Sequence, residues 1–204
     1  MKILQKAKKA ALPLVLAGGL ATSAQAETNG FVEFSGEYTQ FTSEGFLQDV
    51  YGGAYGGSMG AGLESGPVLL GGRLTFLFNS GDSEKFRSFT REEKTTQNLS
   101  IIGIEPYIGF QTPGQIKLFG VLGYGFYQMN DEIKEMSRSW FTEERRTDTI
   151  KDNVSGMFFE VGAKINIEKI TDAYTRAAVK AAIGSRSASP IKGPYVRLGL
   201  ELEL

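Results

Sequence analysis

The sequence of 204 residues contains no histidine and no cysteine. Without cysteine no disulfide can hold the fold, so core packing or a membrane must do so. Without histidine, a serine or cysteine nucleophile has no histidine base, and a zinc site made of histidine and cysteine cannot form. Walker and dinucleotide-binding fingerprints are also missing. The sequence therefore predicts a protein that is not an enzyme and that holds no metal and no cofactor.

Long apolar runs are missing after residue 26, so no membrane-spanning helix is predicted. Residues 1–26 have the layout of a secretory signal peptide: a lysine-rich start, an apolar stretch over 10–21 and the cleavage motif Ala24-Gln25-Ala26. We expect cleavage after Ala26 and one exported domain, residues 27–204. Acidic residues outnumber basic ones in that domain, which is not the charge of a nucleic-acid-binding protein.

The chain does contain segments in which apolar and polar residues alternate. The clearest is the last ten residues, YVRLGLELEL. Successive side chains of a β-strand point to opposite faces. Residues 195–204 are therefore predicted to form a strand with an aliphatic face, running from Val196 to Leu204, and a polar face carrying Arg197, Glu201 and Glu203. The glycine content and the scarcity of helical periods extend this prediction to an all-β fold.

Eight segments alternate in this way, at residues 31–40, 54–63, 68–78, 99–111, 116–128, 154–167, 173–184 and 195–204. The links between them alternate between long (41–53, 79–98, 129–153, 185–194) and short (64–67, 112–114, 168–172). Transmembrane strands need about 9–11 residues, and bacterial outer-membrane barrels combine an even strand count with short turns on one side and long loops on the other. This predicts an eight-stranded antiparallel up-and-down transmembrane β-barrel, closed by pairing of 195–204 with 31–40.

In this architecture the chain resembles the small eight-stranded outer-membrane proteins, the group of the OmpA barrel, OmpX, OmpW and the opacity proteins. The resemblance implies a bacterial outer-membrane location, contact with outer-membrane lipid and lipopolysaccharide, and insertion by the barrel assembly machinery through the last strand. Leu204 stands where that terminal signature usually has an aromatic residue. The enzymes known among such barrels depend on a histidine, which this chain lacks.

If the apolar face of each strand points to lipid, the side chains of the other face point into the lumen. Twelve of these are charged. They are Glu33, Glu37, Glu105, Glu160, Glu201 and Glu203 with Arg73, Lys117, Lys164, Arg176, Lys180 and Arg197. An eight-stranded barrel leaves room inside only for side chains, and charges there must be paired. The balanced set predicts a plug of mutually neutralising charges; a gated ion path is the alternative.

Pro106 interrupts the fourth segment and is expected roughly opposite Gly120 of the fifth. Proline cannot donate to the ladder and belongs at edges or bulges, but a closed barrel has no edge. A local bulge is one interpretation. A weakened lateral seam is the other, through which an apolar solute passes from lumen to lipid, as OmpW-like proteins are thought to do.

The long loops are rich in charges of both signs. Candidate binding residues there are Arg87, Arg91, Arg138, Arg145 and Arg146 for phosphate groups, and Trp140 with Phe141 for a protein partner. Solvated hairpin extensions are the alternative. Two functions follow from these features: a structural or surface-interaction barrel that acts through its outer loops, or a transport barrel for small, apolar solutes.

Overall fold

The computed structural model describes residues 28–42, 46–81, 84–87, 91–139, 142–167 and 176–204. The predicted signal peptide, residues 1–26, lies outside them. The elements are β1 (Thr28–Gln40), α2 (Phe46–Tyr51), β2 (Gly53–Ser65), β3 (Val68–Ser80), β4 (Glu84–Arg87), β5 (Arg91–Gln111), β6 (Ile116–Ser139), β7 (Glu143–Ile167), β8 (Ala177–Arg186) and β9 (Gly193–Glu203). Within the described ranges no helix is long and apolar enough to cross a membrane.

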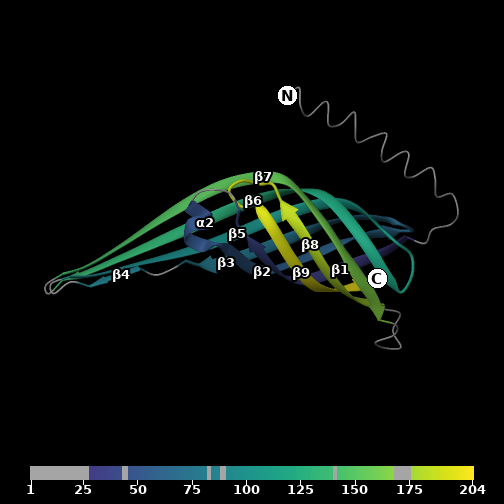
Figure 1. The fold of residues 1–204 in the computed structure, drawn as a ribbon, viewed down its shortest axis with the longest axis horizontal. Helices are drawn as coiled ribbons and strands as arrows, with labels where there is room; N and C mark the ends of the chain where they lie inside the picture. Colours follow the sequence, from purple (N-terminus) through teal and green to yellow (C-terminus); the bar gives the residue numbers. More distant parts are fainter. Residues whose placement is uncertain (1–27, 43–45, 82–83, 88–90, 140–141, 168–175) are drawn as a thin grey trace, which may run out of the picture.

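Eight of these strands close into an antiparallel up-and-down barrel, as predicted (Figure 1). Neighbours along the chain pair in turn, β3 pairs directly with β5, and β4 pairs only with the outer part of β5. The barrel closes where β1 meets β9, from Phe31 opposite Glu203 to Thr39 opposite Tyr195. The predicted partnership between the two ends of the domain is confirmed.

The aliphatic faces of the strands form the outer surface of the barrel. Leu198 is 68% exposed and Phe126 is 55% exposed, and other large apolar side chains of the same parity are similarly exposed. The inward-facing side chains instead include two buried apolar clusters. One cluster lies at the end where α2 enters and contains Phe41, Tyr51 and Ile191. The other contains Phe119 and Phe158.

The structure corrects two predicted loops. Residues 91–98 extend β5, while 129–139 and 143–153 extend β6 and β7, far beyond the barrel (Figure 1). We call these extensions, together with β4, the protruding sheet. Both of its faces are polar, so it lacks the apolar alternation by which a half-buried strand is recognised. Pairing with the neighbouring strand makes it a sheet, for example Glu92 opposite Arg138.

The predicted long link over 41–53 contains a short helix, α2. Its last residue, Tyr51, donates a hydrogen bond to Asp131 Oδ1 (2.6 Å) on β6. Burial and this carboxylate raise the pKa of the Tyr51 phenol, so it stays protonated and keeps donating at neutral pH. α2 is thereby fixed at the mouth of the barrel beside the apolar cluster to which Tyr51 belongs.

Candidate functional site

The middle of the lumen is a layer of buried arginines and glutamates. Arg186 pairs with Glu37 and with Glu105, where Nη2 lies 2.8 Å from Oε1. Arg197 links the same Glu37 to Glu160, with Nη1 2.6 Å from Oε2. These side chains come from β1, β5, β7, β8 and β9, so the ion pairs join strands across the lumen.

Arg73 extends this layer toward the end of the barrel where β1 begins and β9 ends. Its Nη1 is 2.8 Å from Glu160 Oε2 and its Nε is 2.6 Å from Glu33 Oε1. Lys180 Nζ then lies 2.7 Å from the other oxygen of Glu33. Arg73 and Glu160 are fully or almost fully buried, so their attraction is weakly screened.

The chain of ion pairs continues to the rim. Lys180 also approaches Glu201 (3.8 Å), Lys164 lies 2.6 Å from Glu201 and 2.9 Å from Glu64, and Lys117 pairs with Glu64. We call the whole set the lumen ion-pair chain. It has six acidic members, Glu33, Glu37, Glu64, Glu105, Glu160 and Glu201, and six basic ones, Arg73, Lys117, Lys164, Lys180, Arg186 and Arg197. Their charges sum to zero.

Aromatic rings fill the spaces between the charged groups. The guanidinium of Arg186 lies 4.2 Å from the ring centre of Tyr195, and that of Arg73 lies 4.5 Å from Tyr107. Lys180 Nζ lies 4.5 Å from the ring of Phe119. Such cation–π contacts stabilise desolvated cations without using a carboxylate. The lumen is therefore packed with rings as well as neutralised by pairing.

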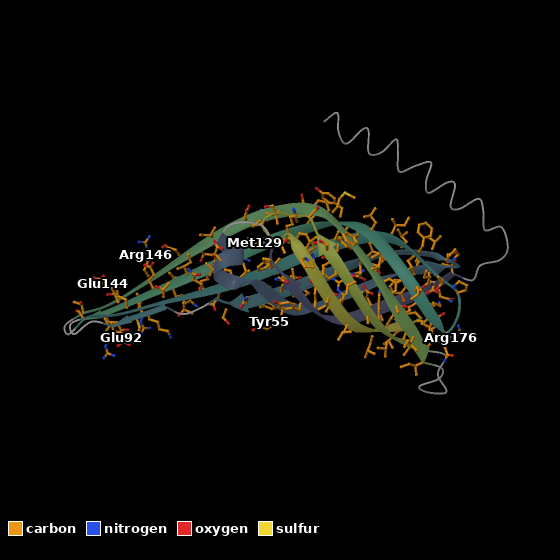
Figure 2. All side chains as sticks on the ribbon, viewed as in Figure 1. Tyr55, Glu92, Met129, Glu144, Arg146 and Arg176 are labelled. Carbon is orange, nitrogen blue, oxygen red and sulfur yellow. The ribbon has the colours of Figure 1, made fainter. Side chains whose placement is uncertain are left out.

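Ten of the twelve predicted lumen charges belong to this chain of pairs. The prediction for Arg176 is wrong: it precedes β8 at the rim, and its side chain is 74% exposed (Figure 2). Glu203 also lies at the rim, where Asn29 Nδ2 donates to it (2.5 Å). Arg186 and Glu64 were missed because they fall just outside the predicted strands, at the end of β8 and of β2. If the two predicted strands are lengthened by up to two residues, their inward-facing side chains include Glu64 and Arg186.

Pro106 lies on the lipid-facing parity of β5, between β3 and β6. On the β6 side the pairing skips it: Ile104 is opposite Phe126, Tyr107 is opposite Gly123, and no pair is formed in between. The register is the same on both sides of this gap, so no extra residue is inserted and the bulge interpretation is wrong. The predicted position opposite Gly120 is wrong too, because Gly120 pairs with Phe110.

The gap is covered on the lumen side by rings. A Cβ on Gly123 would lie 2.4 Å from the ring of Phe158, and one on Gly125 would lie 2.1 Å from the Tyr127 hydroxyl. These two glycines of β6 thus make room for the rings beside Pro106. On the lipid side, an open groove of about 540 Å³ lies over Ala61, Gly72 and Pro106.

The candidate loop arginines are spread over the protruding sheet. Arg145 and Arg146 are exposed on β7, and each pairs with a carboxylate of its own strand: Arg145 with Glu143 (2.6 Å) and Arg146 with Asp148 (2.9 Å). Arg138 on β6 lies opposite Glu143 on β7. Arg87 and Arg91 lie in β4 and at the start of β5. Trp140 and Phe141 lie outside the described residues.

Among the described residues no group of three or more acidic side chains is arranged to hold a metal ion.

The model of the outer membrane protein beta-barrel domain family matches residues 11–187. No curated protein matches the sequence. Among solved structures, Ail of Yersinia pestis, bound to the heparin analogue sucrose octasulfate, is 11% identical and has a TM-score of 0.51, with 89% of this chain and 100% of that chain covered. OprG of Pseudomonas aeruginosa is 8% identical with a TM-score of 0.50, covering 88% and 97%. At these identities the likeness concerns the fold.

We predict that replacing Glu160 with Gln lowers the free energy of unfolding by about 3 kcal/mol, because Arg73 and Arg197 would keep buried charges without their shared partner. Lys117→Gln is the matched control at the half-buried rim and should cost about 1 kcal/mol or less. Urea unfolding in detergent micelles measures both. Equal losses in the two variants would contradict a central role for the buried layer.

Proposed function

The chain belongs to the family of outer-membrane β-barrel domains, and from this premise we propose that it is a sealed barrel that presents its protruding sheet at the cell surface for contact with other macromolecules. Proteins of this family lie in the bacterial outer membrane, and so does this chain. Its aliphatic outer face contacts membrane lipid. In the proposed role it is not an enzyme: the barrel is an anchor and the sheet is the working part.

The observation that carries this proposal is the lumen ion-pair chain with its apolar clusters. A water-filled path would have to separate charges such as Arg73 and Glu160 that are almost completely buried. Breaking one partner from a buried pair costs about 3–5 kcal/mol. Opening the lumen would require several such steps together with displacement of the apolar mouth cluster. A plug therefore fits this arrangement better than a gated ion path.

The protruding sheet supports the second half of the proposal. β6 has 24 residues and β7 has 25, whereas a membrane needs about 9–11 residues per strand. The start of β1 and the end of β9 lie at the opposite end of the barrel, the side of the short links, which faces the periplasm in such barrels (Figure 1). The sheet then points out of the cell. Lipopolysaccharide phosphates around its base and the barrel assembly machinery at the last strand complete the proposed set of partners.

The purified protein in planar lipid bilayers should give no large, sustained openings, because the lumen ion-pair chain leaves no aqueous path. Single-channel recording measures this, with protein-free bilayers as the control. Stable open channels in the wild-type protein would contradict the sealed barrel.

The absence of native cysteine allows the direction of the sheet to be tested with single cysteines. A maleimide linked to a polymer too large to cross the outer membrane should label Glu144→Cys on intact cells, because Glu144 is exposed far out on the sheet (Figure 2). Arg176→Cys, exposed at the opposite end, is the matched control and should be labelled only after permeabilisation. The reverse pattern would refute surface presentation.

A second candidate function is favoured by the gap in the ladder at Pro106. The groove outside it is lined mostly by apolar and small residues, and the rings of Phe158 and Tyr127 pack against the neighbouring glycines of β6. An apolar solute could use this seam if Phe158 and Tyr127 moved aside. This transport role needs a rearrangement of buried rings, whereas surface presentation needs none.

Replacing Pro106 with Val restores a backbone donor where the pairing of β5 with β6 is interrupted. The amide at 106 should then be protected from hydrogen exchange, and uptake of an apolar solute by cells carrying the protein should fall if the seam is a route. Ile104→Val, on the same strand and face, is the control. Uptake that is the same in the wild type and in Pro106→Val would eliminate the transport candidate.

A further inference from the structure

The protruding sheet has a free edge along β7. The last described bond from the β8 side reaches Met157 O, from Ser187 N (2.9 Å). Beyond it, toward Glu143, the described pairing of β7 is with β6 alone. Met157 directs its carbonyl to the β8 side, and in an antiparallel ladder this direction alternates along the strand. The odd-numbered residues from 143 to 155 therefore direct their backbone groups to the free edge.

Sheet edges of natural proteins usually carry features that prevent edge-to-edge pairing. This stretch of β7 carries charges of both signs: Glu143, Glu144, Arg145, Arg146, Asp148, Lys151 and Asp152. Its partner should therefore also carry both signs, in the opposite order. The same edge of a second copy meets this condition most fully in one register.

That register places Thr147 opposite Thr147 of the second copy. Glu143 is then opposite Lys151, and Arg146 is opposite Asp148. By two-fold symmetry each pair occurs twice, which gives four pairs of opposite charge and no directly opposed like charges. The odd residues meet each other, as the hydrogen bonds of an antiparallel ladder require.

The adjacent registers in which odd-numbered residues again lie opposite odd-numbered residues are unfavourable. Sliding the copies by two residues one way places Arg145 opposite Lys151, and sliding them the other way places Arg146 opposite itself. Like charges directly opposite each other on paired strands are destabilising. The charge order of β7 thus favours the register centred on Thr147, because the next register of this kind, centred on Thr149, gives only two pairs of opposite charge, Arg146 with Asp152.

Anchoring in a membrane restricts where the second copy can be. β7 runs from the tip of the sheet toward the membrane, and every copy in one membrane runs in that direction. An antiparallel pair needs the two strands to run in opposite directions, so the copies must be anchored in two membranes that face each other. Thr147 lies ten residues from Met157 at the barrel rim, or about 33 Å at about 3.3 Å per residue. The two rims would be separated by at most about 66 Å.

We propose that the β7 edge is a homophilic adhesion site, through which copies of this chain on opposing outer membranes pair antiparallel over residues 143–151. The proposal rests on the proposed surface presentation and names its partner. In the isolated chain Arg146 pairs with Asp148 of its own strand (2.9 Å). In the pair, the same two residues from both copies form a square of alternating charges. Many weak contacts between two membranes act together, so a weak single pair suffices.

The test uses phosphatidylcholine vesicles that carry the full-length protein, with clustering followed by dynamic light scattering. Wild-type vesicles should cluster, and less so in high salt. Arg146→Asp and Asp148→Arg each place like charges opposite each other, so each should lower the initial clustering rate by about tenfold or more. Vesicles carrying Arg146→Asp mixed with vesicles carrying Asp148→Arg should cluster again, because each variant then faces its complement.

Two further variants sharpen the result. The double variant Arg146→Asp/Asp148→Arg exchanges the charges within one chain and should cluster like the wild type. Lys94→Glu, a charge reversal on β5 and away from the β7 edge, should have no effect. Near-UV circular dichroism and resistance of the barrel to unfolding in SDS check that each variant is folded.

Failure of the wild type to cluster, or failure of the two mixed variants to rescue one another, would overturn the proposal. Either failure, combined with silent bilayers and surface labelling of Glu144→Cys, would leave the sealed, surface-presenting barrel intact. Labelling of Glu144→Cys only after permeabilisation would instead refute the proposed function. The two failures are therefore distinguishable.

Discussion

Closure of the barrel between β1 and β9 is the constraint on which the rest of the structure depends. In the hydrocarbon of a membrane there is no water to satisfy backbone N–H and C=O groups, so a sheet can cross only if its two edges meet. Phe31–Thr39 and Tyr195–Glu203 provide these edges from the two ends of the domain. Once the sheet is closed, each side chain has to face either lipid or a narrow lumen.

The narrow lumen explains why the interior is both charged and full. Eight strands enclose a space that side chains can fill, and the polar parity brings charges into it. Burial makes each charge costly, which is offset by pairing in a chain from Lys117 to Arg186. Tyrosine and phenylalanine rings occupy the remaining volume, and glycines such as Gly123 and Gly125 give them space. Paired charges and rings thus occupy the interior, as the proposed anchor role requires.

Beyond the membrane the constraints are relaxed, and three strands continue as a sheet that is polar on both faces. Water can satisfy its free edge, so β7 needs no neighbour there in a single molecule. That freedom makes the edge available for another chain. The order of charges on it is the feature that distinguishes a specific partner from indiscriminate edge pairing. The proposed role of the protein thus depends on the part of β7 that extends beyond the closed barrel and keeps a free edge.

The sequence by itself determined the eight crossing strands, their two faces and the pairing of the first with the last. These features are local: alternation has a period of two residues, and the membrane sets the strand length. The tertiary structure decided what depends on register. It put Arg186 and Glu64 into the lumen, left Arg176 in solvent at the rim, and placed Pro106 not opposite Gly120 but in the unpaired step between Ile104–Phe126 and Tyr107–Gly123. It also turned two charged loops into strands, because a segment polar on both faces shows its conformation only when a partner strand pairs with it.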